Sequence, residues 1–376
     1  MTEPAVVADA SRCASCGEAL IPGDQFCEAC GAITSDGAAA GMPMEGIAQQ
    51  APTSGAGRQL PPNGGASGGV GGVCASCGAG VVDGYCVSCG VKARTARDHW
   101  SELPAAWLGG VCDRGLVHAR NEDAMALAAT ADETLGVLVV CDGVTSAPES
   151  DRASLAAARA ACQSLLSAGL TVPSGTSAAA IAGWAAELTA AAAAGNAEAV
   201  GVARILGNPP EPPSCTFVAA VVARPDGQHD DQALISVGWC GDSRAYWVPD
   251  DGEPIQLGRD HSLGTEMIDA GVAVAEAEAD PTSHTITRWL GADSVNATPD
   301  LVSLQVATSG WLAVVSDGMW NYASSPAEFA AVVRDSIAGD DPVAIAQAMV
   351  AVANGHGGHD NITVALARLD FPTPTN

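Results

Sequence analysis

Apolar residues in the second half of the chain form two kinds of stretch. Short runs rich in Val, Leu and Ala, each closed by turn residues, are typical of buried strands. These runs predict strands at residues 135–141, 215–223, 233–239, 311–316 and 362–367. Two longer Ala-rich stretches predict helices at residues 154–167 and 177–205. Strands interspersed with long helices indicate an α+β fold.

The first hundred residues have a different organisation. A short motif of cysteines and glycines occurs twice, at residues 11–31 and 73–91. Residues 32–72 between the copies are rich in Gly, Ala and Pro, which is typical of a flexible linker, and residues 92–108 are predicted to be a second linker. We therefore predict two small modules in front of one large domain at residues 109–370.

Composition narrows the possible partners. The 376 residues suffice for one enzyme domain with small appendages, and 43 acidic against 16 basic residues give a net charge of −27. Such a charge disfavours nucleic acid and anionic membranes as partners. The opening MTEPAVVADA lacks a basic segment followed by an apolar stretch, and no apolar run is judged long enough to cross a bilayer. We therefore predict a cytoplasmic protein without membrane insertion.

Eight of the thirteen cysteines form two sets, each made of two C-x-x-C pairs. Four thiolates suit a tetrahedral Zn²⁺ ion and leave no open position for water, so each site is predicted to be structural. Redox cysteines or disulfides are the alternative, which the absence of a secretory signal disfavours. The predicted zinc ligands are Cys13, Cys16, Cys27 and Cys30 in the first set and Cys74, Cys77, Cys86 and Cys89 in the second.

Acidic residues recur at the ends of the predicted strands of the large domain. Asp142, Asp242 and Asp317 each come just after an apolar run, and Asp360 comes just before one. A lone Asp-Gly is usually a turn. Four carboxylates in this arrangement would repel one another without a cation, so we predict a shared site for hard divalent ions.

The motifs around these residues occur in a distinctive order. They are CDRGLVHARNEDA at 112–124, VVCDG at 139–143, SCT at 214–216, CGDSRAYWV at 240–248, GRDHS at 258–262, ITRWLGAD at 286–293, VVSDGMW at 314–320 and GGHDNITV at 357–364. Over residues 109–369 the chain resembles the type 2C, or PPM, family of metal-dependent serine/threonine protein phosphatases. The cysteine modules resemble the double zinc ribbons of bacterial regulatory proteins. The family resemblance implies two packed antiparallel β-sheets flanked by α-helices, with a two-metal centre at one end.

The resemblance also implies the metal ligands. Asp142 would bridge two Mg²⁺ or Mn²⁺ ions, and the carbonyl of Gly143 would bind one of them. Asp317 and Asp360 would hold the other ion. Asp242 matches a position that, together with Asp317, holds a third and weaker ion in similar enzymes.

The implied reaction is hydrolysis of phosphoserine and phosphothreonine in proteins by water activated between the two ions. Glu122 and Asp123 would orient metal-bound waters. Similar phosphatases carry a phosphate-binding arginine where this chain has His118, which has fewer donors than a guanidinium. Arg120 would point to the same face of an extended segment, so we predict that His118 and Arg120 bind the phosphate, with a solvent-exposed Arg120 as the alternative. Val144 replaces a proposed acid histidine of some relatives, which leaves protonation of the leaving group unassigned.

Three functions compete. The first is an active phosphatase whose substrates are the products of a serine/threonine protein kinase. The second is a catalytically weak phosphatase-like module that binds phosphoproteins, docked through its zinc ribbons to an unknown protein; His118 and Val144 favour it. The third, a two-metal nuclease, ranks last because the chain is acidic and lacks basic clusters.

Overall fold

The computed structural model describes residues 73, 78–82, 84–90, 93–170, 178–224 and 232–371. The chain divides into two compact units, Met1–Arg97 and Asp98–Asn376. The linker predicted at residues 32–72 lies outside the described residues, as do six of the predicted zinc ligands: Cys13, Cys16, Cys27, Cys30, Cys74 and Cys77.

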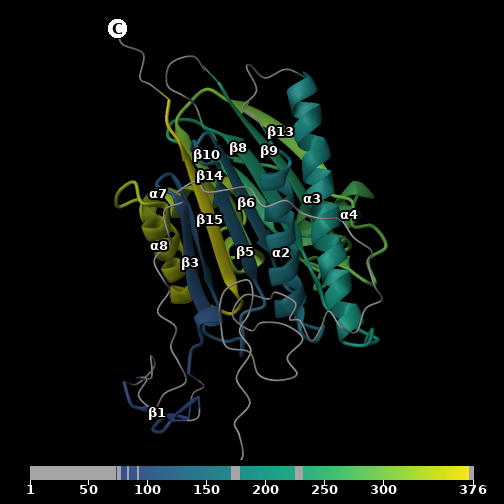
Figure 1. Cartoon of the computed structure of the whole chain (residues 1–376), viewed down its shortest axis with the longest axis vertical. Helices are drawn as coiled ribbons and strands as arrows, with labels where there is room; N and C mark the ends of the chain where they lie inside the picture. The colour runs from purple at the N-terminus through teal and green to yellow at the C-terminus, as the bar shows by residue number, and fades with distance from the viewer. Residues whose placement is uncertain are drawn as a thin grey trace, which may run out of the picture. The chain divides into compact units, whose positions relative to one another are not determined.

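The larger unit is built on two antiparallel sheets (Figure 1). The six-stranded sheet has the order β11-β10-β14-β15-β4-β3, and the five-stranded sheet has the order β13-β9-β8-β6-β5. The first contains β3 (His99–Ala105), β4 (Leu108–Asp113), β10 (Arg244–Pro249), β11 (Ile255–Gln256), β14 (Gly310–Val315) and β15 (Ile362–Leu369). The second contains β5 (Ala124–Ala129), β6 (Leu135–Cys141), β8 (Phe217–Ala223), β9 (Ala233–Cys240) and β13 (Asp300–Val306). A separate short pair is formed by β7 (Ser214–Cys215) and β12 (Leu290–Gly291).

Helices cover the outer face of each sheet. In Figure 1, α2 (Ser150–Ser167) and α3 (Ala178–Ile205) lie over the five-stranded sheet, and α7 (Pro326–Ser336) and α8 (Pro342–Gly355) lie over the six-stranded one. The predicted fold class, two packed antiparallel sheets flanked by helices, is confirmed. The short helices are η1 (Ala96–Asp98), α4 (Leu263–Asp269), α5 (Val274–Glu278) and α6 (Asp317–Trp320).

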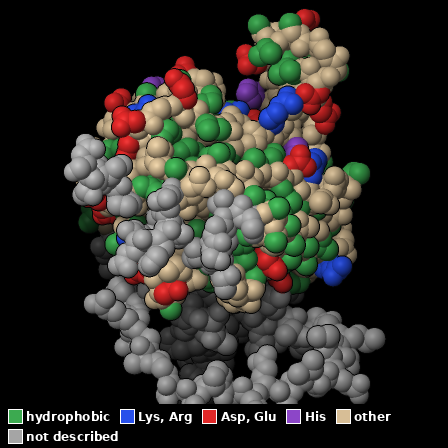
Figure 2. Space-filling view, turned by 90° about the horizontal axis from the view of Figure 1, so that it is seen from above, with side chains coloured by type: hydrophobic (Ala, Val, Ile, Leu, Met, Phe, Trp, Pro, Cys, Tyr) green, Lys and Arg blue, Asp and Glu red, His purple; other side chains and the backbone are tan. Residues whose placement is uncertain are grey.

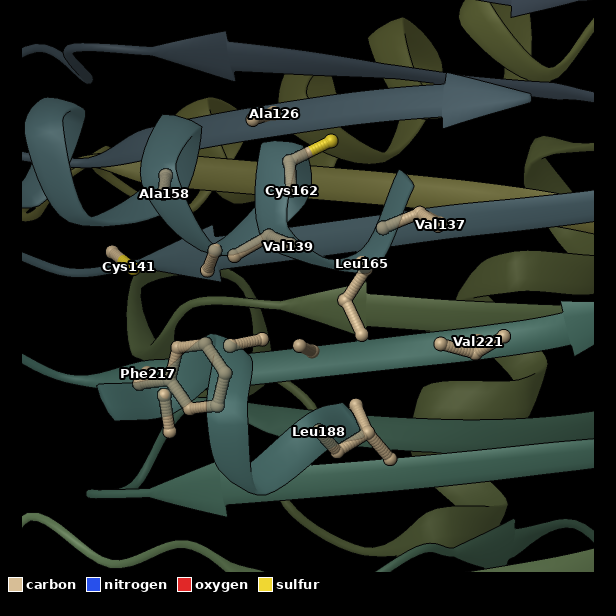
Figure 3. Close-up of a cluster of buried hydrophobic side chains, with 14 of the residues drawn as sticks. Ala126, Val137, Val139, Cys141, Ala158, Cys162, Leu165, Leu188, Phe217 and Val221 are labelled. Atoms are coloured by element: carbon tan, nitrogen blue, oxygen red, sulfur yellow. The ribbon is translucent and has the colours of Figure 1, made fainter. Parts of the chain in front are cut away.

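Alternation along each central strand divides its side chains between two cores. Leu138 and Val140 of β6 lie in the core between the sheets, whereas Val137 and Val139 lie in the core under the helices. Figure 3 shows Val137 and Val139 beside Leu165 of α2. Strands buried on both faces read as continuous apolar runs, which is why the sequence pattern located them. Acidic side chains are instead spread over the molecular face in Figure 2, between hydrophobic and neutral ones.

Most predicted strands match the structure to within two residues. The strand predicted at residues 135–141 is β6, and the run predicted at 362–367 extends to Leu369 in β15. The run predicted at 215–223 is divided, because β7 and β8 lie in different sheets on either side of Thr216. The helix predicted to begin at residue 154 starts at Ser150.

The segment at residues 92–108 differs from the predicted linker. It contains β3, which pairs with β4 at the edge of the six-stranded sheet, and the larger unit begins at Asp98. The pattern HWSELPA is mostly polar and includes Pro104, since an edge strand needs apolar residues on one face at most. Sequence periodicity therefore gave no signal for it.

Helix α3 contradicts the prediction that no apolar run is long enough to cross a bilayer. By length and composition alone, this helix of 28 residues could cross one. Trp184, Leu188 and Ala191 of this helix belong to the core on the five-stranded sheet. Packing within the fold thus accounts for the apolar character of its inner face.

The described part of the second cysteine module is a small hairpin. β1 (Val81–Val82) pairs with β2 (Tyr85–Cys86), and the sulfur of Cys86 accepts from the backbone N–H groups of Ser88 and Cys89, at 3.4 Å each. Gly90 follows with a φ of 72°. Such a turn around a sulfur suits a metal-binding C-x-x-C pair, and zinc binding remains a prediction.

Candidate active site

The sheet registers bring five acidic residues to one end of the sandwich. Strand β6 ends where its antiparallel neighbour β5 begins, and β14 ends where β15 begins. Side chains just outside these strand ends therefore emerge together. They are Asp123 before β5, Asp142 after β6, Asp242 between β9 and β10, Asp317 after β14 and Asp360 before β15.

The carboxylates are near enough to one another for their charges to raise each other's pKa values. Burial raises the pKa of Asp142 well above its usual range, and the charges of Asp123, Asp317, Asp360 and Asp242 raise it further. Burial and then Asp360 raise the pKa of Asp317 to about 6. Ionisation of these carboxyl groups is unfavourable, because no buried cation among the described residues balances their charge.

Asp123 gives the clearest indication that a cation binds among these carboxylates. Its Oδ2 accepts hydrogen bonds from Ser316 Oγ and Thr363 Oγ1, both at 2.7 Å. Its Oδ1 is buried and has no hydrogen-bond partner in the described part of the chain, and the same is true of Asp317 Oδ1. Burial raises the pKa of Asp123 to about 7 despite the two bonds. Buried oxygens without donors suit a hard divalent cation, so these residues fit the predicted metal centre.

The carboxylates are not arranged as a finished coordination shell. Within the described ranges, no three His, Cys, Asp or Glu side chains are placed so that they could already hold an ion. Unbalanced carboxylates repel one another, so donor chemistry and unpartnered oxygens are the better guide here than side-chain convergence.

Two further predicted ligands lie at the border of this group. Asp242 is buried, and burial and then the charge of Asp317 raise its pKa well above the usual range. Its backbone carbonyl accepts from Trp320 Nε1 at 2.9 Å. Gly143 donates its N–H to the carbonyl of Glu122, and a Cβ at this position would lie 2.6 Å from that oxygen. The chain therefore needs glycine here to pass so close to Glu122.

Glu122 anchors the predicted phosphate-binding side. Its Oε1 accepts from Ser150 Oγ at 2.8 Å and from Arg120 Nη2 at 2.9 Å. Arg120 also donates Nε to this oxygen at 3.2 Å, so its side chain is directed to Glu122 although it is 46% exposed. His118 Nε2 lies 3.4 Å from Asp360 Oδ1. His118 and Arg120 thus lie on the same side of the site, and their binding of phosphate stays a prediction.

Asn361 is a site residue that the sequence reasoning did not single out. Its Nδ2 donates to the carbonyls of Arg114 at 2.7 Å and Arg120 at 3.1 Å, while its Oδ1 accepts from the N–H of Glu122 at 2.7 Å. One buried amide therefore connects the Asp360 segment to the segment of Arg120 and Glu122. Its only sequence signal was its position beside Asp360.

The match to known families agrees with this geometry. The model of the Protein phosphatase 2C family matches residues 117–351. The chain belongs to the protein phosphatase 2C family. The matched range contains four of the five aspartates at this end of the sandwich, and Asp360 lies beyond it.

Two curated bacterial phosphatases are similar to the chain over part of their length. The chain is 35% identical over 144 residues to Protein phosphatase PhpP of Streptococcus pneumoniae, which is 38% of this chain and 54% of that protein. It is 30% identical over 152 residues to Serine/threonine phosphatase stp of Listeria innocua, or 40% and 55% of the two chains. The chain thus spans about half the length of the curated relatives it matches.

Solved structures match a larger share of the chain. The serine/threonine phosphatase of S. agalactiae has a TM-score of 0.53 and 25% identity, covering 72% of this chain and all 100% of that chain. The serine/threonine phosphatase PstP/Ppp of Mycobacterium tuberculosis has a TM-score of 0.51 and 23% identity, covering 72% and 99%, and supports the fold.

Proposed function

We propose that this chain hydrolyses phosphoserine and phosphothreonine in proteins. The observation on which this rests is the gathering of Asp142, Asp317 and Asp360 at one end of the sandwich, with Asp317 Oδ1 buried and lacking a donor among the described residues. Membership of the protein phosphatase 2C family supports the same reaction. Asp142, the Gly143 carbonyl, Asp317 and Asp360 would hold two Mg²⁺ or Mn²⁺ ions, with Asp242 beside a third position.

Each side chain then has a defined task. Bound divalent ions would lower the pKa of water and balance the charge of the phosphate. Asp123 presents Oδ1 as an acceptor that orients water, because Ser316 and Thr363 already occupy its Oδ2. Glu122, predicted to orient water, is bonded to Arg120 and in the proposal also positions that guanidinium.

Arg120 and His118 would bind the substrate phosphate together. The bonds to Glu122 use Nε and Nη2 of Arg120, so we assign Nη1 to a phosphate oxygen. A guanidinium shared in this way gives fewer contacts than one that grips phosphate with its whole fork. We therefore expect weaker phosphate binding than a dedicated arginine would provide.

The weak or inactive phosphoprotein-binding module remains the second candidate. It is motivated by His118, which stands where similar phosphatases have arginine and lies 3.4 Å from Asp360 Oδ1. The similarity to phosphatases supports hydrolysis over this alternative. The structural zinc ions, the partner of the zinc ribbons, a role in signalling, the opposing kinase and the cytoplasmic location are proposed on the sequence alone.

Turnover of a phosphothreonine peptide by the full chain tests the proposal. We expect phosphate release that depends on added Mn²⁺ and that falls at least about 10³-fold in Asp317→Asn, equal to about 4 kcal/mol of lost transition-state stabilisation. Asp335→Asn is the matched control, because Asp335 is exposed on α7.

Two results would contradict this assignment. Peptide binding without Mn²⁺-dependent turnover would favour the binding module. Full activity in Asp317→Asn would show that the chemistry lies elsewhere.

A further inference from the structure

Residues 114–120, here called the clamped loop, join β4 to the segment before β5. Asn361 Nδ2 donates to the carbonyl of Arg114 at one end of this loop and to that of Arg120 at the other, at 2.7 and 3.1 Å. Asn361 is almost completely buried. Because one buried amide holds both ends, the loop has a defined conformation without a secondary structure of its own.

The middle of the clamped loop is fixed as firmly. The N–H groups of Leu116 and Val117 both donate to the carbonyl of Gly358, at 2.8 and 3.2 Å. A Cβ on Gly358 would lie 2.9 Å from Leu116 Cγ and 3.0 Å from Leu116 N, so the two backbones are in direct contact. The loop therefore lies against the turn that leads into Asp360.

Two large apolar side chains nevertheless face solvent at this position. Leu116 is 57% exposed and Val117 is 62% exposed. They immediately precede His118, whose Nε2 is 3.4 Å from Asp360 Oδ1. Scattered exposed apolar residues are ordinary, but these two are adjacent, held rigidly and continuous with the candidate active site.

We propose, on the basis of the phosphatase activity proposed above, that Leu116 and Val117 select substrates with an apolar side chain next to the phosphorylated residue. Successive residues of an extended peptide are about 3.3 Å apart, so a phosphate bound near His118 places its neighbours over the clamped loop. An apolar neighbour that covers both side chains makes the free energy of binding more favourable, because apolar surface is removed from water. A charged or polar neighbour would lose water there without gaining a partner.

A pair of phosphothreonine peptides tests this selection. The peptides differ only in the two residues that flank phosphothreonine, which are Leu in one and Ser in the other. With the full chain and Mn²⁺, we expect kcat/KM to be about 10-fold higher for the Leu peptide, at the low end of what one apolar contact contributes to specificity. In the double variant Leu116→Ser with Val117→Ser, the ratio of the two values should fall to near one.

Each ratio compares two peptides with the same enzyme preparation, so the fraction of active enzyme cancels. The matched control is Val274→Ser with Val295→Ser, since these residues are 52% and 99% exposed outside the clamped loop, and it should keep the wild-type ratio. Equal rates for both peptides in the wild type, or a preference that survives in the double variant, would overturn the selection.

Peptide binding separates this proposal from the phosphatase activity. Fluorescence anisotropy with the same two peptides measures the preference without turnover. Absence of hydrolysis together with a Leu116- and Val117-dependent binding preference would contradict only the phosphatase activity. Hydrolysis without any preference would contradict only the selection.

Discussion

Two groups of partly buried charges lie near each other in the larger unit, and only one of them is balanced within the chain. In one, Arg244 donates Nε and Nη2 to the two carboxylate oxygens of Asp260, at 2.9 and 2.7 Å. Its guanidinium also lies 3.4 Å from the ring centroid of Trp320. In the other, Asp142 and Asp317 face further carboxylates, and burial and those charges raise their pKa values.

The difference distinguishes a charge pair that stabilises the fold from carboxylates that are suited to bind a cation. A buried carboxylate that has a bidentate arginine is complete within the chain and stabilises the loop around it. A carboxylate oxygen that is buried without a donor, such as Asp317 Oδ1 in the described structure, needs a partner from outside the chain. Trp320 connects the two groups, since it stacks on Arg244 and donates to the Asp242 carbonyl.

Removal of Arg244 should have the largest effect on stability. In Arg244→Met, Asp260 stays mostly buried without its partner, and we expect the free energy of unfolding to fall by about 3–5 kcal/mol. Urea denaturation measures this loss. Replacing Asp260 by Leu in the same chain should recover part of it, because a balanced apolar pair replaces an unbalanced charge. No recovery would mean that Arg244 acts mainly through Trp320.

Asn361→Asp should have the next largest effect. The substitution keeps the acceptor for the Glu122 N–H but loses the two bonds to the carbonyls of Arg114 and Arg120. We expect a loss of about 2–3 kcal/mol in the free energy of unfolding, together with faster proteolysis in the clamped loop. Asn321→Asp serves as the control, because Asn321 donates to Asp317 without contacting the loop. Unchanged proteolysis would argue against the clamp.

The carboxylate group should make stability depend on pH. The pKa values of Asp123 and Asp317 in the folded chain are about 7 and about 6, above the ordinary value of 3.8, so the folded state binds more protons than the unfolded state. Their contribution is most favourable below about pH 4 and is lost as pH rises to about 7 when no Mg²⁺ or Mn²⁺ is added.

Urea midpoints between these pH values measure the slope, and Asp317→Asn should flatten it. Saturating Mn²⁺ should flatten it as well, because the cation balances the ionised carboxylates. An identical slope in wild type and Asp317→Asn would show that the carboxylates are already balanced in the folded chain.

Arg120→Ala should have the smallest effect. Loss of one phosphate contact should raise KM for the phosphothreonine peptide about 10-fold, equal to about 1.4 kcal/mol, with a smaller change in kcat. Arg224→Ala is the control, since Arg224 follows β8 at the end of the sheet opposite Asp142. A fall in kcat alone would assign Arg120 to the chemical step instead of to binding.

Local sequence was informative where burial is uniform. Strand β6 was predicted with its observed bounds because every residue of it is buried, and Asp142 was singled out because it ends that run. Strand β3 was missed because an edge strand with one buried face carries a weak apolar pattern. The Arg244 to Asp260 pair was missed for a related reason, since nothing in the sequence tells a paired aspartate from an unpaired one.

The amino-acid sequence by itself determined which segments are strands and helices and which acidic residues stand at strand ends, because apolar periodicity is a local property. Tertiary structure alone decided which oxygens find donors and which do not. Asn361 and Arg114 are 247 residues apart and meet only through the pairing of β15 with β4. The fold also leaves Asp123 Oδ1 and Asp317 Oδ1 buried without a donor in the described structure, and this is the physical basis of the proposed metal site.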